Sequence, residues 1–192
     1  MKKGLIIAAA MILAICLGVG GTLAYLFVKT ETVTNTFSPS YIELKLEETT
    51  GKDYHMIPGV EMGKDPKVTA FSDVACYVFV KVEKKNNPDL YLEYTIDSFW
   101  KELDAINYPG VYYKELAAGQ VINGWPILVD DKVTSRASVT KDQLAGLYEA
   151  VGTPDEDKCP QLIFTAYAIQ KDGFADAKAA WPVALAQKNP QQ

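Results

Sequence analysis

The feature that most constrains this chain lies at its N-terminus, where no charged residue occurs between Gly4 and Val28. A pair of lysines precedes this stretch, glycines weaken its second half, and small residues stand at Thr22 and Ala24. A basic start, an apolar helix and small residues at −3 and −1 are typical of a secretory signal peptide. We therefore predict a signal helix over residues 1–24, cleaved between Ala24 and Tyr25.

The same uncharged stretch is long enough to span a bilayer, so an uncleaved membrane anchor is the alternative. Both interpretations place the rest of the chain outside the cell, secreted into the extracellular matrix or held at the cell surface. In the first case, contact with the membrane is limited to the N-terminal signal before its cleavage.

Export from the cell decides which cysteines could form a disulfide. The chain has three, and Cys16 leaves with the signal, so that Cys76 and Cys159 stay in the mature protein. An even number of cysteines in a secreted protein makes this pair a candidate disulfide. The alternative is that both pack as small apolar side chains, because each lies next to a strongly apolar segment.

Composition excludes two classes of protein. Lysine and arginine number 19 against 24 aspartates and glutamates, which gives a net charge of −5 and no basis for coating nucleic acid. An apolar content of 48% in 192 residues is enough for a packed domain and argues against a disordered chain.

Alternating and doubly apolar segments predict strands. Tyr41–Glu47 alternates apolar and charged residues, as a half-buried strand does. Val74–Glu83 is apolar on both faces in its first half and is predicted to be a central strand, as is typical of sheets covered on both sides. Gln161–Gln170 is a second strand that is apolar on both faces. A strand is expected after Pro66, and a hairpin partner for the central strand over Leu90–Ile96.

Weaker strands are expected over Gly110–Ala117, Ile127–Val129 and Val133–Val139. A helix is predicted to begin at Thr140, with Gln143 completing a capping box, and to end at Gly152. A short alanine-rich helix over Ala175–Trp181 would be stopped by Pro182, and residues 97–107 read as a short helix or irregular turn.

Many short strands with few helices predict a mainly β chain: a β-sandwich decorated by short helices and preceded by the signal helix. The predicted domains are the signal at residues 1–24, a strand-like segment at residues 25–37 and the sandwich at residues 38–192.

Motifs for catalysis are missing from the sequence. His55 is the single histidine, whereas catalytic zinc takes three protein ligands, and no nucleophile motif accompanies it. The acidic runs Asp130–Asp131 and Asp155–Asp157 lack the spacing of a calcium loop and are interpreted as solvated turns. We expect no enzyme and no cofactor; calcium or zinc would have no motif to hold it.

The chain is rich in tyrosine. Tyr91, Tyr94, Tyr112 and Tyr113 fall in or near predicted strands. They would either form an adhesive outer face for a carbohydrate or another protein, or pair across strands inside a sheet.

Five segments, taken in order, resemble the TasA/camelysin family of secreted proteins of Gram-positive bacteria. The segments are Gly20–Tyr25; Val33–Pro39 followed by Ile42–Leu46; Met56–Gly59 with Lys64–Val68; Cys76–Glu83; and Phe164–Phe174 with Ala180–Trp181. The resemblance implies a jelly-roll-like β-sandwich at the cell surface or in the biofilm matrix, processed by a SipW-type signal peptidase.

The resemblance also implies fibres built by strand donation, in which the mature N-terminus of one subunit completes a sheet of the next. The candidate donor strand is residues 25–37, with Val28, Thr30, Thr32, Val33 and Phe37 as its side chains. The implied partners are other copies of the chain, with other matrix proteins as further candidates and no nucleic acid. Camelysin-like members are described as surface metalloproteases, for which no zinc motif is present here.

The sequence thus predicts a secreted structural protein that assembles into fibres after signal cleavage. The alternatives are a monomeric surface adhesin or binding module, or a camelysin-like surface metalloprotease.

Overall fold

A computed structural model describes residues 38–51, 54–150 and 152–187. The chain divides into two compact units, residues 1–38 and 39–192, and the fold below is that of the second unit. The predicted signal and the candidate donor strand lie outside the described residues. Within the described part, no helix is long and apolar enough to cross a membrane.

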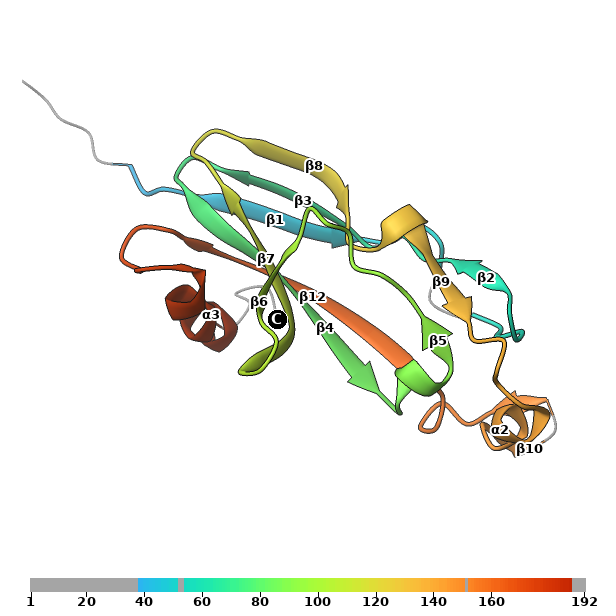
Figure 1. Cartoon of the computed structure of the whole chain (residues 1–192). Coiled ribbons are helices and arrows are strands. Elements are labelled where there is room, and N and C mark those ends of the chain that lie inside the picture. The colour runs from blue at the N-terminus through green and yellow to red at the C-terminus, as the bar shows by residue number, and fades with distance from the viewer. Residues whose placement is uncertain (1–37, 52–53, 151, 188–192) are drawn as a thin grey trace, which may run out of the picture. The chain divides into compact units, whose positions relative to one another are not determined.

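Two antiparallel sheets form the body of this unit (Figure 1). The first has the strand order β1–β3–β8 and the second has the order β12–β4–β7–β6. The strands of the first sheet are β1 (Ile42–Glu47), β3 (Lys67–Ser72) and β8 (Val121–Pro126), and those of the second are β4 (Cys76–Lys85), β6 (Lys101–Asp104), β7 (Tyr108–Leu116) and β12 (Gln161–Gln170).

A hydrophobic core fills the space between these sheets. Val68 of β3, Val78 and Val80 of β4, and Ile122 of β8 are fully buried in it. The chain crosses from one sheet to the other between β3 and β4 and returns between β7 and β8. The mainly β sandwich predicted from the sequence is confirmed, and β4 is a central strand, paired with β12 and β7.

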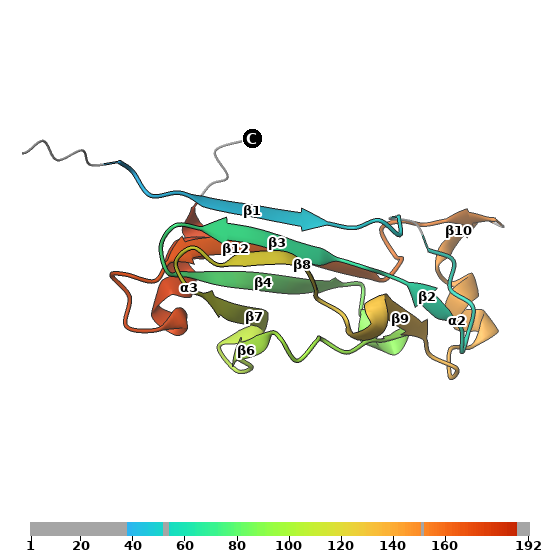
Figure 2. The ribbon, with the colours of Figure 1, turned by 90° about the horizontal axis from the view of Figure 1, so that it is seen from above.

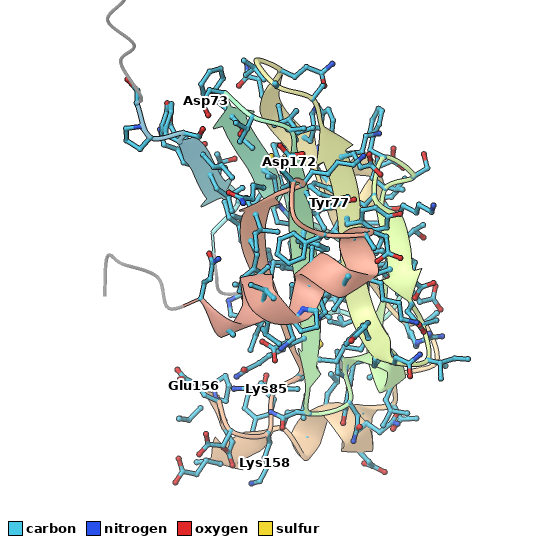
Figure 3. All side chains as sticks on the ribbon, turned by 90° about the vertical axis from the view of Figure 1, so that its left-hand side faces the viewer. Asp73, Tyr77, Lys85, Glu156, Lys158 and Asp172 are labelled. Carbon is cyan, nitrogen blue, oxygen red and sulfur yellow. The ribbon has the colours of Figure 1, made fainter. Side chains whose placement is uncertain are left out.

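Helix α3 (Ala177–Ala186) covers the other face of the second sheet, as Figure 3 shows in front of the strands. Trp181 is buried there, with its ring centroid 5.2 Å from those of Phe79 and Tyr167. The Asp176 side chain caps the helix. Pro182 lies inside α3, so the prediction that it would stop the helix is wrong: burial of the helix face around Trp181 outweighs the one hydrogen bond that a proline removes.

A smaller sheet lies at the end of the sandwich away from α3 (Figures 1 and 2). Its strand order is β2–β9–β5. The strands are β2 (Glu61–Gly63), β5 (Leu92–Glu93) and β9 (Lys132–Ser135). Leu92, Leu128 and Val133 form its own buried cluster.

The hairpin expected between Leu90–Ile96 and the central strand is therefore wrong, because β5 pairs with β9. Asn86 and Asn87 adopt left-handed backbone conformations after β4, and the short 3-10 helix η1 (Pro88–Leu90) follows them. These local turns send the chain away from β4 toward the smaller sheet.

Short elements differ most from the sequence predictions. The capping box of Thr140 and Gln143 is present, but α2 (Lys141–Ala145) ends at Gly146 rather than at Gly152. The chain then forms the pair β10 (Tyr148–Ala150) and β11 (Thr153–Pro154). The predicted strand at residues 127–129 is a single bridge followed by the 3-10 helix η2 (Val129–Asp131), and β6 lies where a helix or turn was expected.

Candidate assembly edge

The two main sheets each have two edge strands, and β12 differs from the other three. It pairs with β4 along all ten of its residues, from Gln161 to Gln170, without a bulge. On its outer side, no strand pairs with it among the residues that the structure describes.

β12 has none of the sequence features that normally protect an exposed edge. Charged side chains, prolines, glycines and bulges discourage pairing with another chain, and the sequence QLIFTAYAIQ contains no charge, no proline and no glycine. The other edges do have such features. They are the charges of β1 (Glu43, Lys45, Glu47), the charges and register shift of β6 (Lys101, Glu102, Asp104), and the glycine, proline and register shift of β8 (Gly124, Pro126).

The flank beside β12 is also incompletely covered. β1 lies next to β12 without hydrogen bonding to it, since β1 pairs only with β3 among the described strands. Apolar side chains on this flank pack against the core but are only partly buried; they are Ile42 and Leu44 of β1 and Phe164, Ala166 and Ala168 of β12.

A groove of about 700 Å³ adjoins the first residues of β12. Met56, Met62, Leu162 and Ile163 give it an apolar lining. The groove therefore continues the apolar surface of the β12 edge toward the smaller sheet.

His55 and Cys159 both line this groove. Burial raises the pKa of the Cys159 thiol, and the nearby carboxylates of Asp155 and Glu156 raise it further. A cysteine nucleophile needs the opposite environment, one that favours the thiolate. The arrangement thus gives no support to cysteine catalysis.

The candidate disulfide is wrong, because the two cysteines lie at opposite ends of the β4–β12 ladder and both are free. Cys76 is opposite Gln170, at the end of β12, whereas Cys159 comes just before its start. Ten strand residues span about 30 Å, far beyond the roughly 7 Å between Cα atoms that a disulfide tolerates. Figure 3 shows the same separation between Asp172 and Lys158.

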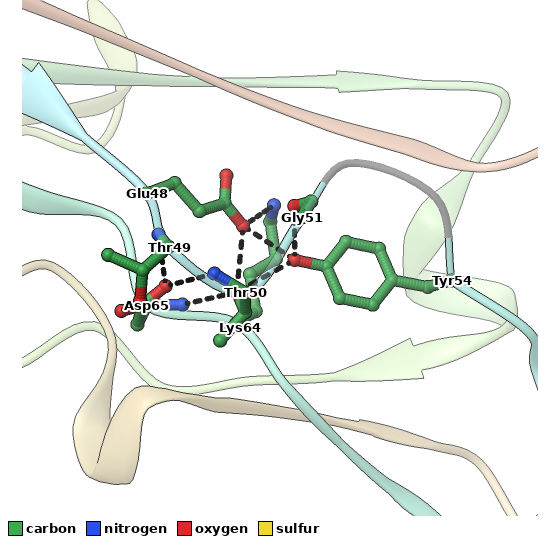
Figure 4. Close-up of polar contacts among 7 residues, drawn as sticks. All are labelled: Glu48, Thr49, Thr50, Gly51, Tyr54, Lys64 and Asp65. Carbon is green, nitrogen blue, oxygen red and sulfur yellow. Dashed lines mark hydrogen bonds and ion pairs between the residues drawn. The ribbon is translucent and has the colours of Figure 1, made fainter.

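β1, in contrast to β12, is fastened at its end by a polar clasp around Asp65 (Figure 4). The Asp65 carboxylate accepts hydrogen bonds from the backbone N–H groups of Thr49 and Thr50 at 2.9 Å and from the Thr49 hydroxyl at 2.6 Å. Asp65 is only 6% exposed. These donors hold its pKa well below the usual range of a carboxyl group.

The clasp extends through Lys64, whose ammonium group lies 2.8 Å from Glu48 Oε1 and faces the rings of Tyr54 and Phe164. The Tyr54 hydroxyl donates to the same Glu48 oxygen at 2.6 Å. Burial and this acceptor raise the pKa of Tyr54 to about 12. No sequence prediction covered this clasp, because no local motif indicates it.

Both acidic runs form ion pairs with lysines. Asp155 pairs with Lys158 at 2.6 Å, and Asp131 pairs with Lys67 at 2.9 Å. In the part of the chain that the structure describes, no three acidic, histidine or cysteine side chains gather into a group that could hold a metal ion.

The four tyrosines do not form one face. Tyr94 and Tyr112 line a common groove. Tyr113 lies on the opposite face of the sheet, among the aromatic side chains under α3, and Tyr91 packs against the cluster of the smaller sheet.

The remaining sequence-predicted sites lie outside the described residues: the cleavage site at Ala24 and Tyr25, and the candidate donor residues Val28, Thr30, Thr32, Val33 and Phe37. Comparison of the chain with protein-family models, with curated proteins and with solved structures returns no match.

Proposed function

We propose that this chain is a secreted structural subunit of the cell surface or biofilm matrix, which assembles into fibres by donor-strand exchange. The donor is the N-terminal segment, residues 25–37, and the acceptor is the outer edge of β12 in a second copy. Cleavage of the signal after Ala24, by a SipW-type peptidase, would release the donor. The proposal assigns no catalytic step and no cofactor to the chain.

The observation that carries this proposal is the unprotected β12 edge. Strand addition gains main-chain hydrogen bonds along the edge and buries alternate side chains against the partner. Along β12, an added strand would cover Phe164, Ala166 and Ala168 on one face while it completes the hydrogen bonding of the outer edge.

The composition of the donor supports the same proposal. Residues 25–37 contain no glycine and no proline, and valine and threonine, which favour strands, recur from Val28 to Thr36. A head-to-tail contact of this kind does not close on itself, so repeated donation produces a filament.

Negative-stain electron microscopy of residues 25–192, beside a chain that begins at Ser38, tests the proposal. Every residue of the three buried clusters lies after Ser38, so the shorter chain keeps its core. We expect fibres from the first and monomers from the second.

Monomers from both chains would contradict self-assembly, and the chain would then be better explained as a monomeric surface binding module. Fibres from both chains would place the assembly contact outside residues 25–37 and would contradict donation by this segment.

A further inference from the structure

A second groove, of about 880 Å³, lies between the end of β4, the start of β7 and the segment that follows β5. Its size falls within the range of roughly 300–1,000 Å³ that is usual for small-molecule sites. Tyr94 and Tyr112 line it together with Val82, Leu92 and Ile96, and we call it the tyrosine groove.

The two tyrosines combine an apolar ring with a polar tip. Both are partly buried, and burial raises the pKa of each hydroxyl, so both keep their proton at neutral pH and can donate as well as accept hydrogen bonds. The Tyr112 ring packs at the edge of the sandwich core, and the Lys84 ammonium group lies 5.6 Å from the centre of the Tyr94 ring. These contacts fix both rings in the wall of the groove.

The charged residues that line the groove neutralise one another. Three lysine or arginine side chains each pair with a carboxylate at N–O distances of 2.8 or 2.9 Å; the pairs are Lys81 with Glu83, Lys84 with Asp89 and Arg136 with Glu93. Glu102 is the remaining charged residue in the lining, and its carboxylate has no ion pair or hydrogen bond to another described residue. The groove therefore offers many polar groups but no unpaired cation.

We infer that the tyrosine groove binds neutral, hydroxyl-rich oligosaccharides. The rings of Tyr94 and Tyr112 provide flat apolar surfaces for the C–H faces of sugar rings, while the tyrosine hydroxyls bond at the ring edge. Sugar hydroxyls can donate to the free Glu102 carboxylate and accept from charged donors at the rim, and such charge-assisted bonds are the stronger ones. A phosphate or uronate ligand would find no unpaired cation here.

The groove is lined by residues of β4 to β7, by Asp89, by residues 94–96 and by Arg136, and it includes no residue of β12. Sugar binding and strand donation thus use different surfaces, and one can fail without the other.

Saturation-transfer NMR tests the inference, with cellohexaose, maltohexaose and laminarihexaose as separate probes. The full chain is used in a detergent without a sugar head group, so that the detergent does not compete. We expect at least one hexasaccharide to bind, and Tyr94→Ala to weaken that binding about tenfold through loss of ring contact. Tyr148→Ala, on an exposed tyrosine of β10 outside the groove, is the matched control and should bind normally.

Glu102→Gln provides a second variant on an exposed strand, should Tyr94→Ala fail to fold, and it is expected to weaken binding several-fold. Absence of binding by all three probes, equal binding by the folded groove variants, or an equal loss in Tyr148→Ala would overturn the inference.

Discussion

The edge strands β1 and β12 lie side by side at one flank of the sandwich, yet they are built differently. β1 alternates apolar residues with Glu43, Lys45 and Glu47, and the Asp65 clasp fastens the chain directly after it. β12 has no charged residue, no bulge and no partner on its outer side within the described residues. Charges protect the first edge from further pairing, whereas nothing of the kind protects the second.

The difference indicates that the β1 edge is complete, whereas the β12 edge lacks a neighbouring strand among the described residues. A strand that is apolar on both faces is normally covered on both faces, as β4 is by the sandwich core on one face and by the aromatic cluster under α3 on the other. β12 is covered on the same two faces, but it stands at the edge of its sheet without the charge, proline, glycine or bulge that an edge strand normally has. Local sequence and global position usually agree in a folded domain, and a disagreement is expected at functional sites. The missing neighbour is the part that we assign to a second copy.

The largest effect is expected from a charge placed on the β12 edge. In the chain of residues 25–192, Ile163→Lys should abolish fibres, because an added strand would have to desolvate the ammonium group. The new lysine lies opposite Glu83 in the register, which helps the variant to fold. Thr165→Glu, opposite Lys81, should act in the same way with the opposite charge.

Glu43→Gln is the matched control, since it changes the charge of β1 by the same amount as Ile163→Lys. Electron microscopy and sedimentation of the variants check the comparison, with thermal unfolding as the test of folding. Normal fibres from both β12 variants would contradict β12 as the acceptor edge, and loss of fibres from Glu43→Gln alone would assign the acceptor role to β1.

A smaller effect is expected from Asp65, whose carboxylate fastens β1. Asp65→Asn should lower the free energy of unfolding by about 2 kcal/mol, because three hydrogen bonds lose their charged acceptor. Chemical denaturation of the chain that begins at Ser38 measures this value. An unchanged free energy would mean that the clasp does not hold the end of β1.

The depressed pKa of Asp65 predicts that the stability of the fold depends on pH. The folded-state pKa of Asp65 is depressed, so its stabilisation is fully present above the ordinary carboxyl pKa of about 3.9 and is lost as the pH falls through the folded value. Stability should therefore decrease below about pH 4, and less steeply in Asp65→Asn. Parallel pH profiles for the two proteins would contradict this assignment.

The smallest effect is a difference in alkylation rate between the two cysteines at opposite ends of the β4–β12 ladder. Both thiols should be free in the folded chain of residues 25–192, with Cys159, which is partly exposed, alkylated faster than the buried Cys76. Mass spectrometry after timed iodoacetamide treatment measures both rates. A mass lower by two hydrogens would contradict the register of the ladder, and equal rates would contradict the burial of Cys76.

The strands with the strongest pattern of apolar residues were the easiest to predict from the sequence. β12 was predicted with its observed bounds and β4 nearly so, because apolar residues on both faces of a segment dictate a buried strand. The capping box of Thr140 was recognised for a similarly local reason. Pairing was harder to predict, since β5 joins β9 through turns at Asn86 and Asn87 whose left-handed backbone no motif announced.

The candidate assembly edge was even harder to predict from the sequence. The donor segment could be proposed from the sequence, but the acceptor edge depends on which strand ends up last in its sheet. The Asp65 clasp depends on contacts between segments that are distant in the sequence, and the separation of Cys76 from Cys159 depends on strand register. Neither kind of information is contained in a short stretch of residues.

The most direct test of the account is amide hydrogen exchange of the chain that begins at Ser38, with and without a synthetic peptide of residues 25–37. The account predicts slower exchange along β12 when the peptide is added and unchanged exchange along β1, because the peptide hydrogen-bonds to the unprotected edge. Unchanged exchange along β12, or protection of β1 instead, would contradict the claim that β12 accepts the donor strand.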